Sequence, residues 1–184
     1  MKSVLISIRP EWVEKITSGK KKIEVRKTAP KEVPFKAYIY CAKAKIKWSL
    51  CDYEGAYRNT EGEIVYAQQH IIGEFVCDKV ERFSVGSLRS DDIEKLACLS
   101  YYEMICYFYK PEELDGKTAK QGFAWHISDL KIYDKPKELS EFCIPCKVSC
   151  ENCKNPLYFE CWCEEKGKKV VTRPPRSWCY VEEI

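Results

Sequence analysis

The sequence predicts an α+β fold in which short strands and a few short helices precede a cysteine-rich C-terminal segment. Runs of β-branched and aromatic residues recur over residues 1–139, as is typical of strands. Helix signals with capping residues separate several of these runs. Six cysteines then fall within residues 143–163. We therefore expect one main domain at residues 1–139 and a small cysteine-rich unit at residues 140–184.

Composition indicates a folded protein and leaves its partner open. Hydrophobic residues make up 45% of the chain and charged residues 32%, which argues against disorder. The net charge of +3 is too small to indicate nucleic-acid binding. Basic residues are nevertheless concentrated between residues 19 and 47, so this part faces either an anionic partner or solvent. They are Lys20, Lys21, Lys22, Arg26, Lys27, Lys31, Lys36, Lys43, Lys45 and Lys47.

The chain shows no signal for export or membrane insertion. No apolar run approaches the roughly 20 residues that span a bilayer, and Arg9 follows the opening apolar run too soon for a signal peptide. We therefore expect a cytoplasmic protein without a membrane partner. In reducing surroundings, its twelve cysteines are expected to be metal ligands and buried thiols rather than disulfides.

The first 26 residues predict a strand, a helix and a second strand. Residues 4–8 are rich in β-formers, Pro10 suits a first helical turn, and Gly19 ends a helix over residues 11–17. Residues 22–26 then alternate strictly between polar and apolar. In a strand, Glu24 and Arg26 would therefore share one face, where they can form an ion pair.

Further strands are predicted at residues 35–41, 70–80 and 122–133, and helices at residues 90–96 and 100–108. Gly73 lies inside its predicted strand, which indicates a bulge or a close backbone approach. Residues 48–69 form a polar, tyrosine-rich insertion whose structure the pattern does not predict. Five scattered cysteines are expected to be small buried hydrophobes, namely Cys41, Cys51, Cys77, Cys98 and Cys106.

The segment from Gly19 to Arg26 matches the pattern G-x-K-x-x-E-x-R at every specified position. In this respect the chain resembles the ASCH domain family, which places the pattern after an opening strand and a short helix. Residues 72–75 and 122–127 also look like core strands of that family. The resemblance covers residues 1–139 and implies a PUA-like β-barrel, with a cleft that holds RNA, another single-stranded nucleic acid or a modified nucleotide.

Charged and aromatic residues at and near this pattern are the candidate binding residues. Lys21 and Arg26 suit phosphate or an exocyclic oxygen, and Glu24 can accept hydrogen bonds from a base edge. Trp12 and Trp125 are candidate stacking surfaces. The alternatives are a solvated lysine turn, a plain Glu24–Arg26 salt bridge and a core position for Trp12. The full candidate set is Arg9, Trp12, Lys20, Lys21, Glu24, Arg26, Glu74 and Trp125.

Two further functions stay open. Some small ASCH proteins are amidohydrolases that act on N4-acetylcytidine with a lysine, a threonine and a glutamate. By that resemblance Lys21 and Glu74 would be catalytic, but Glu24 stands where threonine is expected. A carboxylate attacking an amide gives a mixed anhydride, so Glu24 or Glu74 would instead activate water as a general base. Alternatively, residues 101–109 could bind a protein partner.

The cysteine-rich segment predicts a structural zinc site. The spacings Cys143-x2-Cys146 and Cys150-x2-Cys153 let paired thiolates reach one tetrahedral ion. The linker between the two pairs is short, which favours Cys146, Cys150 and Cys153, closed by Cys161 or Cys163. Cys143 would then be spare. Four thiolates leave no open coordination position, so the zinc would be structural; an iron–sulfur cluster is the alternative.

The last residues are expected to return to the barrel, which would make the zinc knuckle an insertion. Residues 170–181 contain a proline pair followed by an aromatic strand pattern. This ending resembles that of ASCH proteins from bacterial phages and prophages.

Overall fold

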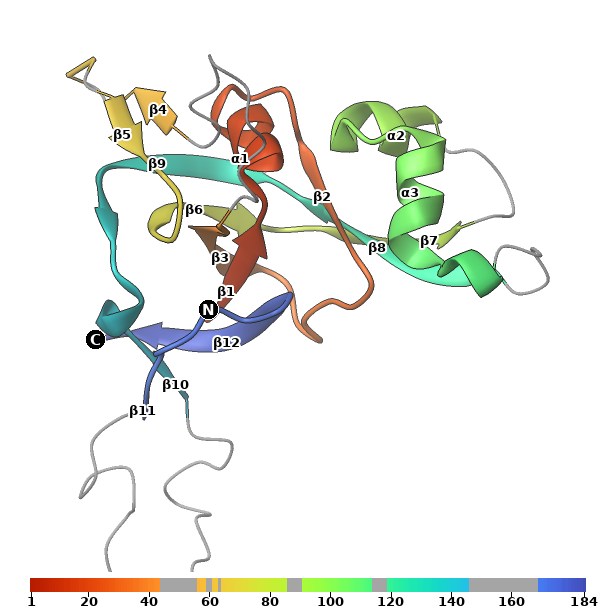
Figure 1. Cartoon of the computed structure of the whole chain (residues 1–184). Coiled ribbons are helices and arrows are strands. Elements are labelled where there is room, and N and C mark those ends of the chain that lie inside the picture. Colours follow the sequence, from red (N-terminus) through yellow and green to blue (C-terminus); the bar gives the residue numbers. More distant parts are fainter. Residues whose placement is uncertain (44–55, 59–60, 63, 86–90, 114–118, 146–168) are drawn as a thin grey trace, which may run out of the picture.

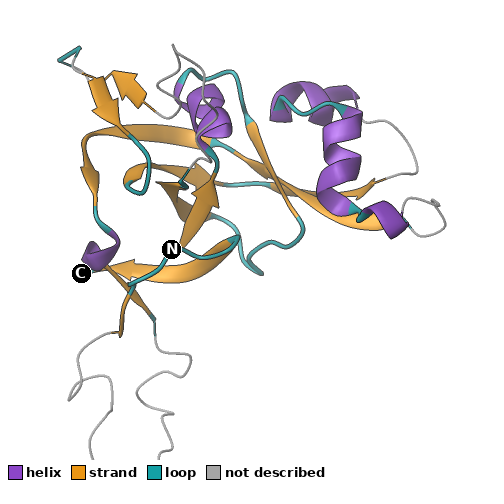
Figure 2. Cartoon of the chain, in the orientation of Figure 1, coloured by secondary structure: helices purple, strands orange, loops and turns teal. Residues whose placement is uncertain are grey.

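The computed structural model describes residues 1–43, 56–58, 61–62, 64–85, 91–113, 119–145 and 169–184. Strands are the main regular element, and the helices are short (Figure 2). The helices are α1 (Pro10–Thr17), α2 (Asp91–Ala97), α3 (Tyr101–Phe108), η1 (Pro111–Glu113) and η2 (Leu139–Glu141). The strands are β1 (Lys2–Ile8), β2 (Ile23–Arg26), β3 (Phe35–Cys41), β4 (Ala56–Arg58), β5 (Ile64–Tyr66), β6 (Ile71–Cys77), β7 (Val80–Val85), β8 (Lys120–His126), β9 (Ser128–Lys137), β10 (Phe142–Ile144), β11 (Lys169–Val170) and β12 (Trp178–Glu183).

The strands form a large and a small sheet, with β4 and β5 paired separately. The large sheet has the order β11-β10-β12-β1-β3-β6-β9, and the small one has the order β2-β8-β7. Within the large sheet β1 runs parallel to β3 and antiparallel to β12. The C-terminal strand therefore lies beside the N-terminal one, as Figure 1 shows.

The described strands do not close into the barrel expected from the family resemblance. The chain changes sheets at Ile127, since β8 pairs with β2 and β7 whereas β9 pairs with β6. A second change falls between β6 and β7, at Asp78 and Lys79. The run at residues 122–133, predicted as one strand, therefore belongs to two strands, whereas the run at residues 70–80 forms β6 and reaches only the first residue of β7.

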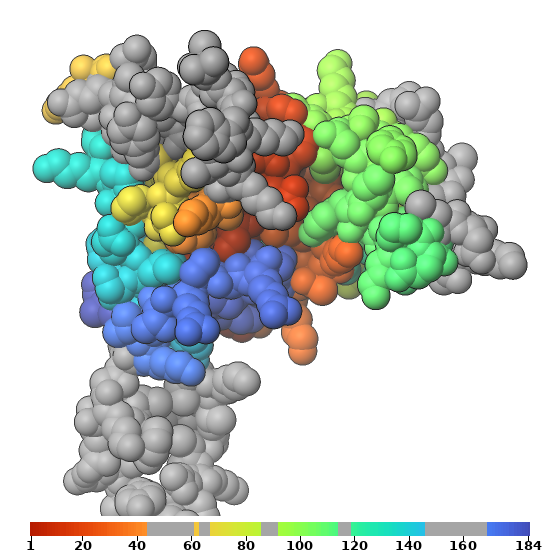
Figure 3. Space-filling model, in the orientation of Figure 1, coloured from red at the N-terminus to blue at the C-terminus, as the bar shows by residue number. Residues whose placement is uncertain are grey.

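The core lies mainly on the face of the large sheet that α1 covers. Val4, Ile6 and Ile8 alternate onto this face of β1, where Val13 and Ile16 of the helix join them. Leu5 points to the opposite face, which Phe142 and Val181 cover. A third cluster packs α2 and α3 against the small sheet, and Figure 3 shows this helix pair beside the N-terminal segment.

Several local expectations are confirmed. A Cβ on Gly73 would lie 2.4 Å from the Lys131 carbonyl oxygen, so only glycine fits this close approach. Ser100 begins α3 with a capping box, in which its hydroxyl accepts from the Glu103 amide at 3.3 Å. The prediction for Cys106 is wrong, because this side chain is exposed on α3, whereas Cys41 and Cys77 are buried.

In the described parts of the chain, no helix combines the length and the apolar character that a membrane span requires.

Candidate functional site

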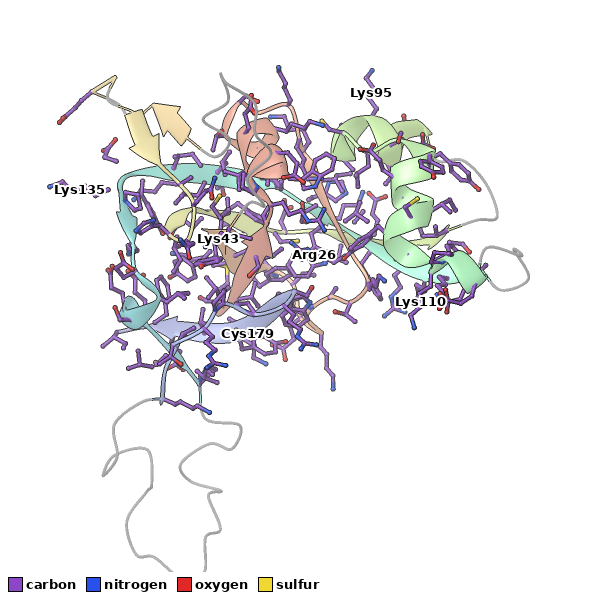
Figure 4. All side chains as sticks on the ribbon, in the orientation of Figure 1. Arg26, Lys43, Lys95, Lys110, Lys135 and Cys179 are labelled. Atoms are coloured by element: carbon purple, nitrogen blue, oxygen red, sulfur yellow. The ribbon has the colours of Figure 1, made fainter. Side chains whose placement is uncertain are left out.

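Three charged side chains from the Gly19–Arg26 segment form a buried cluster, which we call the charged triad: Lys21, Glu24 and Arg26. Lys21 Nζ lies 3.4 Å from Glu24 Oε2, and Arg26 Nε lies 3.0 Å from Glu24 Oε1. Each of the three residues is at most 7% exposed. Figure 4 labels Arg26 in the middle of the molecule, between β1 and the helix pair.

The local sequence dictates how the triad is presented. Gly19 adopts a left-handed φ of 69°, which ends α1 and turns the chain toward β2. The alternation of β2 then turns Ile23 and Val25 into the apolar cluster with α2 and α3. As predicted, Glu24 and Arg26 share the other face of the strand and pair with each other.

Residues from both ends of the chain hold Arg26. One terminal nitrogen donates to the Ser7 carbonyl at 2.7 Å, and the other donates to the Ser177 hydroxyl at 3.3 Å. The Ser7 amide in turn donates to the Ser177 carbonyl at 2.9 Å. Reasoning from the sequence did not find Ser7 or Ser177, because backbone groups and small hydroxyls brought together by folding leave no local pattern.

The C-terminal end of α2 contacts the same segment. Lys21 Nζ donates to the Ala97 carbonyl at 2.7 Å, and the Lys22 amide donates to the Leu96 carbonyl at 2.8 Å. Lys15 Nζ reaches the Cys98 carbonyl at 3.5 Å. Cations at a helix C-terminus satisfy its free carbonyls and favour its dipole. Lys21 therefore connects α2 to the carboxylate of Glu24.

The triad does not use its full hydrogen-bonding capacity. Glu24 Oε2 and Arg26 Nε are buried and have no hydrogen-bond partner, although each lies within ion-pair distance of an opposite charge. These contacts are close enough for attraction but are not aligned for donation. A buried polar atom without a partner costs about 1–3 kcal/mol, so an arrangement that keeps two of them calls for an explanation beyond stability.

The family model described as "ASCH domain" matches residues 6–168, which include the whole triad. The chain belongs to the ASCH domain family. The assignment from the Gly19–Arg26 pattern is thus confirmed.

Solved structures agree with the ASCH fold. The crystal structure of ASCH from Zymomonas mobilis has a TM-score of 0.54 and 18% identity, with 98% of this chain and 88% of that chain covered. The S128A mutant of that protein has a TM-score of 0.56 and 17% identity, covering 98% and 89%. At this identity the likeness establishes the fold alone. Among curated proteins, none matches this chain.

Three other predicted binding residues of this ASCH domain precede the triad in the sequence, namely Arg9, Trp12 and Lys20. The Trp12 ring is partly buried beside the triad, with Lys21 Nζ 5.3 Å and Lys15 Nζ 4.3 Å from the ring centroid. Lys20 is exposed in the turn that precedes Lys21. Arg9 is exposed where α1 begins and lies 3.9 Å from Glu11. Trp12 therefore packs against the core, as one interpretation of the sequence expected, and its ring also lies next to Lys21. Its role as a stacking surface stays a prediction.

Trp125 lies inside the core. Its side chain is fully buried, with Phe35 at 5.0 Å and Trp178 at 5.7 Å between ring centroids. Trp125 is directly opposite Glu24 in the antiparallel β2–β8 pair, so the two side chains lie next to each other on one face of the small sheet. In this structure neither face of its ring is open for a base to stack.

Glu74 is placed apart from the triad. It lies opposite Tyr38 in the β3–β6 pair, on the face where the Tyr38 ring packs on Phe142. Tyr133 donates to Glu74 at 2.5 Å and Lys36 donates at 3.1 Å. Partial burial opposes ionisation, but these hydrogen bonds outweigh it and lower the pKa of Glu74. The three candidate catalytic residues are therefore not brought together.

The predicted zinc ligands Cys146, Cys150, Cys153, Cys161 and Cys163 lie outside the described residues. Within the described residues, no group of three or more potential ligands could hold a metal ion. Cys143 is described, and its buried thiol donates to the Glu182 carbonyl at 3.5 Å. The zinc knuckle and the phage-like ending stay predictions.

A shallow depression of about 340 Å³ lies elsewhere, lined by residues of β7, of β8 and of the position just before β8. Arg82, Phe83, Ser84, Ala119 and Gln121 form its walls. None of the triad residues lines it, so it is not the site that the sequence pattern marks.

Proposed function

We propose that this ASCH protein binds a single-stranded nucleic acid or a modified nucleotide through the charged triad. The observation that carries the proposal is the excess of positive charge in a buried place. Two cations, Lys21 and Arg26, contact one carboxylate, Glu24, so the group carries a formal charge of +1. Buried charge is costly unless it is compensated, and an incoming anion would compensate it.

The surroundings of the triad favour a phosphate as that anion. Lys20, Lys22 and Lys27 are exposed on either side of the buried residues, so positive charge continues from the triad to the surface. Arg26 offers a planar guanidinium, which suits phosphate oxygens. Glu24 Oε2, which lacks a hydrogen-bond partner, would accept from an amino or imino group of a base edge.

The first experiment is a fluorescence titration of short single-stranded RNA and DNA at about 50 mM and about 200 mM salt. We expect binding that weakens with salt, because phosphate contacts release counterions. Removing one charged contact, worth about 1.5–3 kcal/mol, should weaken binding tenfold or more. Lys21→Met tests this contact while it keeps most of the aliphatic stem, and Lys21→Ala is the simpler companion.

The matched control is Lys95→Ala, which removes an exposed lysine from α2. If Lys21→Met and Lys95→Ala bind equally well, the triad is a structural ion-pair cluster and the proposal fails. If the wild-type protein binds no strand even at low salt, a nucleoside-sized ligand or a protein partner becomes the better interpretation.

The amidohydrolase alternative is less well supported by the geometry. It needs a base and a lysine at one substrate, but Glu74 is engaged with Lys36 and Tyr133 on another face of the sheet. Glu24 alone would have to activate water. An assay for acetate released from N4-acetylcytidine separates this activity from simple binding.

A protein-binding role has one observation in its favour. Tyr102 is 75% exposed and Tyr107 is 39% exposed on α3. Aromatic residues are enriched at protein interfaces. This candidate becomes the stronger one only if the strand titrations show no binding.

A further inference from the structure

Tyr107 of α3 is an aromatic residue at the edge of the triad that the sequence pattern does not mark. Its side chain is 39% exposed, although its neighbours Met104 and Phe108 on the same helix are buried. Its ring meets the Phe108 ring edge-on at 5.0 Å. Lys27 Nζ, from the residue that follows β2, lies 5.1 Å from its ring centroid. One side of the residue is thus anchored, while part of the ring faces solvent.

The Tyr107 hydroxyl is influenced by two members of the triad, Glu24 and Arg26. Burial of the hydroxyl raises its pKa, and the carboxylate of Glu24 acts in the same direction, while Arg26 acts against them. Together with the contact between Lys27 Nζ and the ring, they place Tyr107 near the end of β2, on the Arg26 side of the cluster.

An aromatic ring therefore lies at each end of the group formed by the charged triad and Lys27. Trp12 lies at the Lys21 end, 5.3 Å from the ammonium group, and Tyr107 lies at the end formed by Arg26 and Lys27. Proteins that bind single strands combine positive charge for the phosphates with aromatic rings on which bases stack. Charged residues between two rings provide both features. Tyr107 is exposed, whereas Trp12 is partly buried.

We propose that Tyr107 is a stacking surface for a nucleobase whose phosphate or polar edge is held by the charged triad and Lys27. The inference rests on the proposed function and adds to it a role for the α2–α3 helix pair, which would supply one wall of the binding site. The competing structural role is simpler. In that case Tyr107 only fastens α3 to β2 through its hydroxyl, and its ring makes no ligand contact.

The test compares two probes on the full chain. One is a fluorescein-labelled single-stranded RNA decamer of mixed sequence, and the other has the same backbone with abasic positions. Stacking predicts that Tyr107→Leu weakens binding of the first probe roughly 5- to 150-fold and leaves the second nearly unchanged. Tyr107→Phe and Tyr107→Trp keep a ring and should retain the preference for bases. A second non-aromatic variant, Tyr107→Gln, is included in case the leucine variant does not fold.

The control is Tyr102→Leu, which removes a more exposed ring from the same helix and should leave both affinities unchanged. Lys21→Met should weaken both probes, since both carry phosphates. If Lys21→Met behaves this way but Tyr107→Leu binds the base-bearing probe like wild type, the stacking role fails and the proposed function survives.

Equal losses for both probes with Tyr107→Phe would indicate the structural role. Absence of any binding by the wild-type protein would overturn both proposals. A DNA decamer in parallel shows whether the sugar matters.

Discussion

At the scale of single residues, Glu24 is the side chain on which the buried charges depend. It lies between Lys21 and Arg26, at 3.4 Å and 3.0 Å, and all three are largely removed from water. Without its carboxylate, two like charges would remain buried beside a neutral group. Removing one partner of a buried ion pair typically costs about 3–5 kcal/mol, because the remaining charge is uncompensated.

We therefore expect Glu24→Gln to lower the free energy of unfolding by about 3 kcal/mol or more. Urea denaturation of both proteins measures this difference. Glu14→Gln, at an exposed position of α1, is the matched control and should change stability by less than about 0.5 kcal/mol. Adding Lys21→Met to Glu24→Gln should recover part of the loss. A loss below about 1 kcal/mol would mean that water reaches these charges.

The sequence predicted the charged residues of the site better than their surroundings. Lys21, Glu24 and Arg26 were found because strand alternation and one spaced pattern determine their common location. Ser177 and the Ala97 carbonyl were missed, since they reach the triad from distant parts of the chain. Trp125 was a candidate stacking surface because of its aromatic ring, and the sequence does not show that Phe35 and Trp178 pack against that ring.

At the scale of elements, strand composition predicted where the strands lie but not which sheet each one joins. The stretches at residues 70–80 and 122–133 read as continuous strands because β-formers fill them without a strong turn signal. The break at Asp78 separates β6, which pairs with β3 and β9, from β7, which pairs with β8. The break at Ile127 separates β8, which pairs with β2 and β7, from β9, which pairs with β6. Such pairings are long-range, and local propensity does not encode them.

The cysteine-rich segment begins and ends at two paired strands. In β10 and β11, Cys143 is opposite Val170 and Ile144 is opposite Lys169. Both ends of the segment are thus held side by side, as Figure 1 shows, which suits a unit closed by a metal ion. We propose that one zinc ion binds there through Cys146, Cys150 and Cys153 with Cys161 or Cys163.

Elemental analysis of the purified protein should then give about one equivalent of zinc, as a four-thiolate site requires. Changing Cys150 and Cys153 together to serine should abolish the zinc content, because two ligands are lost. Cys106→Ser, which alters an exposed cysteine on α3, should leave it unchanged. Iron with visible absorption would indicate a cluster instead, and a stable protein without metal would refute the site.

At the scale of the whole molecule, the two ends of the chain complete one sheet. The C-terminal strand β12 lies between β1 and β10, and Ser177 just before it contacts both Ser7 and Arg26. Val181 and Phe142 also cover the outer face of β1. A chain that ended at residue 139 would expose this apolar face and leave Arg26 without one of its supports.

We therefore expect two deletions to behave in opposite ways. Replacing residues 145–168 by Asn-Gly would join Ile144 to Lys169, which are directly opposite each other, through a two-residue hairpin turn. This variant should keep the cooperative urea unfolding of the full chain, since every pairing of β12 is retained.

The chain of residues 1–139 should lose cooperative unfolding, because the edge of β1 and the face under Phe142 become exposed. Cooperative unfolding of the shorter chain would instead show that residues 1–139 fold alone, and loss of folding in the hairpin variant would show that the cysteine-rich segment supports the sheet.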